Sequence, residues 1–104
     1  MDIMEQVNTY LDEAISIRRK IHRHPEVAMK EYNTTRLIKE ELEKYGIEIE
    51  DKGYDVGVSA IIRGGHPGKT VALRADIDAL PITEQSGLDY ASKIPGVAHA
   101  CGHD

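Results

Sequence analysis

The last six residues of the chain carry the side chains best suited to binding a metal ion. Cys101 and His103 are two positions apart, so both side chains leave the same face of the chain if this segment is extended. Thiolate and imidazole groups are ligands that borderline-soft metals such as Zn²⁺ accept, and Gly102 leaves room for close approach. His99 and Asp104 stand beside them as further ligands or supporting groups.

A lone Cys-x-His pair is a weak signal, because a single buried thiol beside a few surface histidines gives the same pattern. A structural zinc site needs four protein ligands and a catalytic zinc site about three. Beyond Cys101 and His103, the remaining ligands must therefore come from Asp76, His99, another chain or additional sequence.

A second group of reactive side chains follows an apolar run. Residues 70–73 predict a strand buried on both faces, and strands of α/β sheets deliver functional residues at their carboxyl ends. Arg74, Asp76 and Asp78 come directly after this run, where they can ligate a metal or take part in catalysis. The alternative is an Arg–Asp ion pair that closes a loop.

The other histidines are weaker candidates. His22 and His24 lie in a basic cluster at the end of a predicted helix, and we interpret them as capping and ion-pairing groups. His66 lies in a loop rich in glycine and proline and is predicted to be exposed. The sequence contains no GxSxG, P-loop or GxGxxG pattern, which argues against a serine hydrolase, a nucleotide site or a dinucleotide site.

The elements that must position these groups begin with two helices. Apolar residues recur at helical spacing from Asp2 to about Ile21, with Asp2 as the N-cap, and Pro25 prevents continuation. A second helix is predicted to start at residues 31–34 and to end at Gly46, which suits the C′ position.

Strands follow the helices. Twofold alternation in residues 47–50 and 56–62 predicts two strands, and residues 70–73 predict a third. The order of elements indicates an α/β fold in which two helices are followed by a mixed sheet.

Composition excludes several classes of partner. The 13 basic and 18 acidic side chains give a net charge of −5, which leaves no phosphate-seeking patch and argues against nucleic acid. No apolar run approaches the roughly 20 residues of a membrane span, and the first residues do not resemble a secretory signal. One cysteine allows no intrachain disulfide. We therefore expect a cytoplasmic protein without a membrane partner.

Three stretches of the chain, in order, resemble the motifs of one family. Residues 18–26 (RRKIHRHPE) resemble its RRxxHxxPE opening, residues 73–82 (LRADIDALPI) its LRADxDALPI segment, and residues 99–104 its HACGHD metal motif. By these motifs the chain is identified as a member of the M20 metallopeptidases. The match falls in the amidohydrolase branch, which includes hippurate hydrolases, N-acyl-amino-acid deacylases and auxin-conjugate hydrolases.

The resemblance implies that residues 1–104 form the N-terminal part of a zinc-dependent exopeptidase-like catalytic domain. Such a domain binds two divalent metals, Zn or Mn, and carries a lid domain that often serves for dimerisation. Cys101 and His103 match metal ligands, and Asp76 matches an acidic residue that supports the metal site from behind the ligands. The wider family has a histidine ligand where this branch and this chain have Arg74, so Arg74 is not counted as a ligand.

The implied reaction is hydrolysis of the amide bond of N-acyl amino acids, peptides or related small conjugates by a homo-oligomeric enzyme. In the family, the general-base glutamate and the remaining ligands follow the HACGHD motif, so we expect an N-terminal fragment of 104 residues to be inactive alone. One alternative is a non-enzymatic α/β module that associates with itself through unpaired sheet edges. Another is a metal-binding fragment. A small zinc-stapled structural domain is disfavoured, because closely spaced ligands rarely complete a tetrahedron alone.

Overall fold

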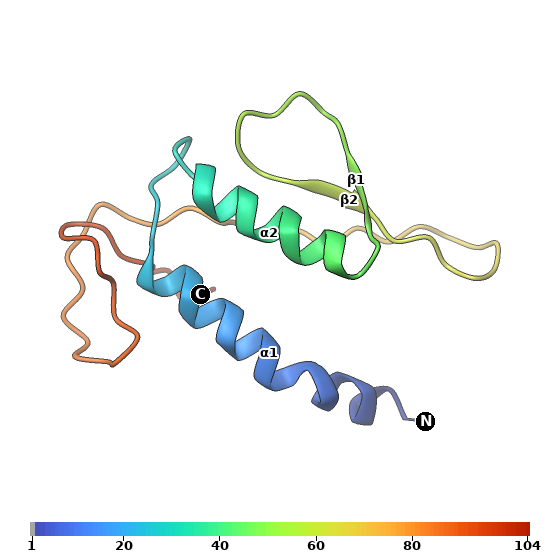
Figure 1. Cartoon of the computed structure of the whole chain (residues 1–104), viewed down its shortest axis with the longest axis horizontal. Coiled ribbons are helices and arrows are strands. Elements are labelled where there is room, and N and C mark those ends of the chain that lie inside the picture. The colour runs from blue at the N-terminus through green and yellow to red at the C-terminus, as the bar shows by residue number, and fades with distance from the viewer. Residues whose placement is uncertain (1) are drawn as a thin grey trace.

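Two helices and a β-hairpin make up the regular structure of the computed structural model, which describes residues 2–104. The elements are α1 (Ile3–Arg23), α2 (Tyr32–Lys44), β1 (Glu48–Glu50) and β2 (Ser59–Ile61). Figure 1 shows the hairpin beside α2, and the remaining chain returning so that the C-terminus lies beside α1. The predicted order of two helices followed by a sheet is confirmed.

Both ends of α1 follow from local chemistry. The Asp2 side chain accepts a hydrogen bond from the Met4 backbone N–H at 3.3 Å, so the predicted N-cap is confirmed. The helix continues two residues beyond the predicted end at Ile21 and stops before Pro25, which disfavours helical geometry in the preceding residue. Basic side chains in the last turn face the negative end of the helix dipole.

The C-terminus of α2 is a Schellman motif. Gly46 has a positive φ of 68°, and its N–H donates to the carbonyl of Glu43. The Ile47 N–H donates to the carbonyl of Leu42, which completes the paired pattern of this motif. The predicted role of Gly46 as the C′ residue is confirmed.

The N-terminus of α2 is capped from outside the helix. The carboxylate of Glu26 accepts hydrogen bonds from the backbone N–H groups of Thr34 at 2.6 Å and Asn33 at 3.2 Å. Burial opposes ionisation of Glu26, but the hydrogen bonds from Thr34 and Asn33 outweigh it and hold the pKa of this carboxyl below its ordinary value. Glu26 therefore anchors the turn after α1 to the start of α2.

The sheet of the described residues is a two-stranded antiparallel hairpin in which Ile49 is paired with Ala60. The strand predicted at residues 70–73 is wrong, because this segment is not a strand and Leu73 is 98% exposed. A strand of this apolar type is stabilised by neighbours on both sides, and residues 2–104 provide none beside it.

The chain buries little apolar surface. Its accessible surface is 8403 Å², whereas a compact monomer of 11.6 kDa exposes about 5,800 Å². Its radius of gyration is 15.6 Å, against about 13 Å for a compact chain of this length. The buried apolar residues of the described chain are Pro25, Ala79 and Ala98, while Ile3, Val7 and Leu11 of α1 are exposed. Among residues 2–104, no helix has the length and apolar character needed to cross a membrane.

Candidate functional site

Backbone hydrogen bonds bring the three sequence motifs together. The Ala79 N–H donates to the carbonyl of Glu26 at 2.8 Å, which joins the second motif to the first. Leu80 and Ala98 exchange two hydrogen bonds of 2.9 and 3.0 Å, which join the second motif to the segment just before the third. Ala79 and Ala98 are 3% and 2% exposed at this junction, where small side chains allow the backbones to approach. Segments far apart in sequence thus form one unit.

A cleft of about 640 Å³ lies beside this junction, and we call it the motif cleft. Helix α1 contributes an apolar wall to it through Ala14, Ile17 and Ile21. The groups able to ligate a metal or exchange a proton come from the second and third motifs: Asp76, Asp78, His99, Cys101, His103 and Asp104. The apolar wall and these polar groups are the combination typical of a ligand site.

The predicted ligands Cys101 and His103 both line the motif cleft, and both are exposed. The segment that holds them is a turn and is not extended, because the Asp104 N–H donates to the carbonyl of Cys101 at 3.1 Å. Within residues 2–104, no three His, Cys, Asp or Glu side chains are grouped so that they could hold a metal ion. The metal roles of Cys101 and His103 therefore remain predictions.

His99 also lines the motif cleft. Its Nε2 atom is buried and has no hydrogen-bond partner in the part of the chain that the structure describes. Burial lowers the pKa of His99, and this effect outweighs the opposite influence of Asp104 and Asp78. A neutral imidazole keeps a lone pair, so the donor set of sulfur, nitrogen and carboxylate oxygen around the cleft suits a divalent metal.

Asp76, the predicted supporting acid, lies in an ion pair with Arg74. The guanidinium Nη2 of Arg74 is 2.8 Å from Asp76 Oδ1, and the side chains are 88% and 63% exposed. This contact is the Arg–Asp pair weighed as the alternative to a functional role. An exposed pair of this kind contributes at most about 1 kcal/mol to stability. A role for Asp76 at a metal site stays a prediction.

The most connected buried polar side chain at the junction is His22 of α1. Its Nδ1 lies 2.9 Å from Asp104 Oδ2, and its Nε2 lies 2.9 Å from Glu84 Oε1. Asp104 Oδ2 also accepts from Arg18 at 3.2 Å. The interpretation of His22 as an ion-pairing residue is supported, with partners 62 and 82 residues away along the chain.

Sequence reasoning missed Glu84, because nothing in its local pattern marks it. Its carboxylate accepts hydrogen bonds from the Ser86 hydroxyl and, at 2.8 Å, from the Ser92 N–H. The bond from Ser86 is the largest influence, followed by Ser92 and then His22, and together they lower the pKa of Glu84 to about 2. Glu84 is thus held ionised beside the His22 ring.

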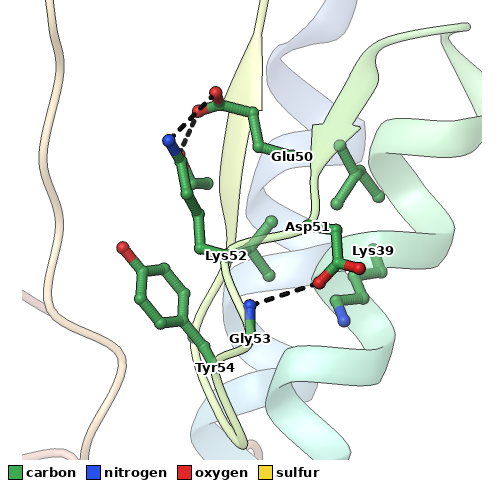
Figure 2. Close-up of a pocket in the computed structure, with 10 residues that line it drawn as sticks. Lys39, Glu50, Asp51, Lys52, Gly53 and Tyr54 are labelled. Atoms are coloured by element: carbon green, nitrogen blue, oxygen red, sulfur yellow. Dashed lines mark hydrogen bonds and ion pairs between the residues drawn. The ribbon is translucent and has the colours of Figure 1, made fainter.

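A smaller hollow of about 150 Å³ lies in the hairpin loop between β1 and β2, near Lys39 of α2. Figure 2 shows two pairs among its polar groups: Lys52 lies against Glu50, at 3.4 Å, and the Gly53 N–H donates to Asp51, at 3.2 Å. These contacts are local to the loop. The motif cleft is therefore the stronger candidate.

Comparison with known proteins points to one family. A profile of Peptidase family M20/M25/M40 matches residues 72–104. The chain is 51% identical over 109 residues to thermostable carboxypeptidase 1 of Saccharolobus solfataricus, covering all of this chain and 28% of that protein. It is 49% identical to N-acetyl-L-cysteine deacetylase of Bacillus subtilis, covering 94% of this chain and 24% of that protein. The chain therefore spans about a quarter of the length of these curated relatives.

Two solved structures share the fold. One is the Bacillus subtilis YXEP protein, described as a dinuclear metal binding peptidase from the M20 family, with a TM-score of 0.86 and 46% identity. The match covers 92% of this chain and 27% of that one. The other is a putative aminohydrolase from methicillin-resistant Staphylococcus aureus, with a TM-score of 0.88, 44% identity, and coverage of 97% and 27%. The two helices and the hairpin match the N-terminal part of M20 peptidase structures.

Proposed function

The chain belongs to the M20 peptidase family, and from that premise we propose that the protein carrying it is a metal-dependent amidohydrolase. The observation that supports this most directly is the meeting of all three family motifs at one cleft. Relatives named as carboxypeptidases and as deacetylases point to the amide bond of an N-acyl amino acid or short peptide as the target.

Cys101 and His103 are the residues of this chain proposed to hold metal, with His99 and Asp76 of the same cleft as supporting groups. Two divalent metals, Zn or Mn, would supply an activated water and polarise the amide carbonyl. The chain's own contribution is to fix the ligand turn and to place the apolar wall of α1 beside it. The general base and the other ligands must come from other residues, because a catalytic site needs about three ligands per metal.

The same ligand count predicts that the 104-residue chain alone hydrolyses no amide. Its open structure also supports the proposal of a homo-oligomer or of further covering segments, because the exposed face of α1 carries Ile3, Val7 and Leu11. A cytoplasmic location, expected from the sequence, belongs to the same proposal.

A second candidate is a non-enzymatic module that associates with itself. The feature that favours it is the short hairpin, whose strands have no further neighbour among the described residues. The two readings differ in metal dependence, since self-association needs no metal.

The test uses the product of the complete gene that contains this chain. Its metal content and its hydrolysis of N-acetyl amino acids, N-benzoyl amino acids and dipeptides would be measured. We expect about two metals per chain, and at least about 100-fold lower activity with loss of metal in Cys101→Ser and His103→Ala. His66→Ala is the matched control, since His66 is an exposed loop histidine. Full activity and metal content in both ligand variants would exclude the proposed site.

A further inference from the structure

We propose that His22 is a positioning residue that clamps the turn bearing Cys101 and His103 against helix α1. This inference rests on the proposed function of that turn. It assigns a task to a side chain that does not line the motif cleft and so acts through its neighbours.

The His22 ring is buried, and both of its nitrogens are paired. His22 is 6% exposed, and both of its nitrogens face carboxylate oxygens at 2.9 Å. A hydrogen bond between a ring nitrogen and a carboxylate is charge-assisted and stronger than a bond between neutral groups. The imidazole therefore joins two acidic side chains that would otherwise repel each other in a space shielded from water.

Asp104 connects His22 to the turn that bears Cys101 and His103. Asp104 follows His103 directly, and its Oδ2 accepts from both His22 and Arg18. These two donors are four residues apart on α1, so they point from the same face of the helix. The Asp104 N–H is bonded to the carbonyl of Cys101, so holding Asp104 holds the whole turn between the two predicted ligands.

On the Nε2 side of the ring, His22 is paired with Glu84, which is itself held in place. Glu84, which accepts from His22 Nε2, is fixed by Ser86 and by the backbone N–H of Ser92. The Lys93 N–H in turn donates to the carbonyl of Arg23 at the end of α1, at 2.8 Å. His22 is thus supported by an anchored loop on one side and restrains the ligand turn on the other.

Neighbouring groups do not replace this link. Tyr90 packs edge-on against the His22 ring with centroids 5.6 Å apart, and Arg19 lies 4.6 Å over Tyr90. These contacts pack around the His22 ring, but neither of them includes Asp104. Without the imidazole, Arg18 is the one side chain among residues 2–104 that stays paired with Asp104, and it is 48% exposed.

The test separates local positioning from general stability. In the metal-free product of the complete gene, hydrogen exchange is measured by mass spectrometry for peptides covering residues 99–104 and α2. We expect His22→Phe, which keeps an aromatic ring and removes both ring nitrogens, to speed exchange in the ligand turn about 10-fold and to leave α2 unchanged. Affinity for Zn²⁺ should fall about 10- to 100-fold. His24→Phe is the control, because His24 is an exposed histidine at the end of the same helix.

Equal acceleration in both peptides, or no change in the turn, would overturn the proposal. If His22→Phe fails to fold, Arg18→Met decides the question: it removes one donor from Asp104, and a smaller acceleration confined to residues 99–104 is expected. Unchanged exchange in that variant also counts against the clamp. Because exchange is read without metal or substrate, the clamp can stand even if the Cys101 and His103 variants show that the proposed function is wrong.

Discussion

The Tyr45 hydroxyl donates to the Glu13 carboxylate at 2.6 Å and so ties the C-terminal end of α2 to the middle of α1. The Tyr45 ring also meets Tyr10 edge-on, with centroids 6.3 Å apart. This relationship fixes the two helices side by side at the end opposite the motif junction. The hydrogen bond to Glu13, followed by burial and the negative charge of Glu13, raises the pKa of Tyr45 to about 12.

We expect this tyrosine to make stability sensitive to alkaline pH. Its folded pKa lies above the ordinary value of 10.0, so its contribution is fully present below pH 10 and is lost as the pH rises to about 12. Tyr45→Phe should flatten the fall in the free energy of unfolding over this range, measured by denaturant titration. Tyr32→Phe, at another exposed tyrosine, should leave the slope unchanged.

Gly46→Ala should destabilise the chain through backbone conformation alone. The glycine has a φ of 68°, and a Cβ there meets no atom within 4 Å, so no steric clash contributes. The left-handed conformation costs a residue with a Cβ roughly 1–2 kcal/mol. Gly64→Ala is the matched control, because that glycine also has open space around it and lacks the positive φ. Equal unfolding free energies for the two variants would contradict the role of the Schellman motif.

The features that the sequence predicted correctly are those set by neighbouring residues. The Asp2 cap, the Gly46 stop and the alternation of the hairpin each depend on residues within a few positions of one another. The prediction of a strand at residues 70–73 was wrong because a strand forms only beside partner strands. The apolar composition of the segment does not say whether such partners are present. The capping role of Glu26 likewise had no signal in its immediate neighbours, because Glu26 caps α2 across a turn.

The candidate site could be predicted only as a set of residue types. Family resemblance identified Cys101, His103 and Asp76, and the structure brings all three to one cleft. Spacing alone did not reveal the backbone conformation of the Cys101–His103 segment, where a hydrogen bond closes a turn. The contacts of His22 with Glu84 and Asp104 had no local signal, because they are made only when distant segments meet.

The junction of the three motifs should be intolerant of larger side chains. Ala98 is 2% exposed and forms the paired bridge to Leu80, so Ala98→Leu must displace backbone or neighbouring side chains. Overpacking of this kind costs about 1–3 kcal/mol of unfolding free energy. Ala28→Leu, at an exposed position, should change stability far less. Equal stability of the two variants, measured by urea denaturation, would mean that the junction adapts without strain.

Glu84 should make the junction sensitive to acid. Hydrogen bonds, first from Ser86 and then from Ser92 and His22, lower its folded pKa to about 2 from the ordinary 4.5. A carboxyl with a depressed folded pKa contributes stability above its unfolded value, and this contribution is lost as the pH falls from 4.5 to about 2. Glu84→Gln should therefore lower stability at neutral pH and flatten the acid limb of the stability profile. Glu48→Gln provides the control, because that carboxylate pairs with Arg63 at an exposed position, with side chains 54% and 71% accessible. If Glu84→Gln retains the wild-type acid dependence, ionisation of Glu84 does not stabilise the junction.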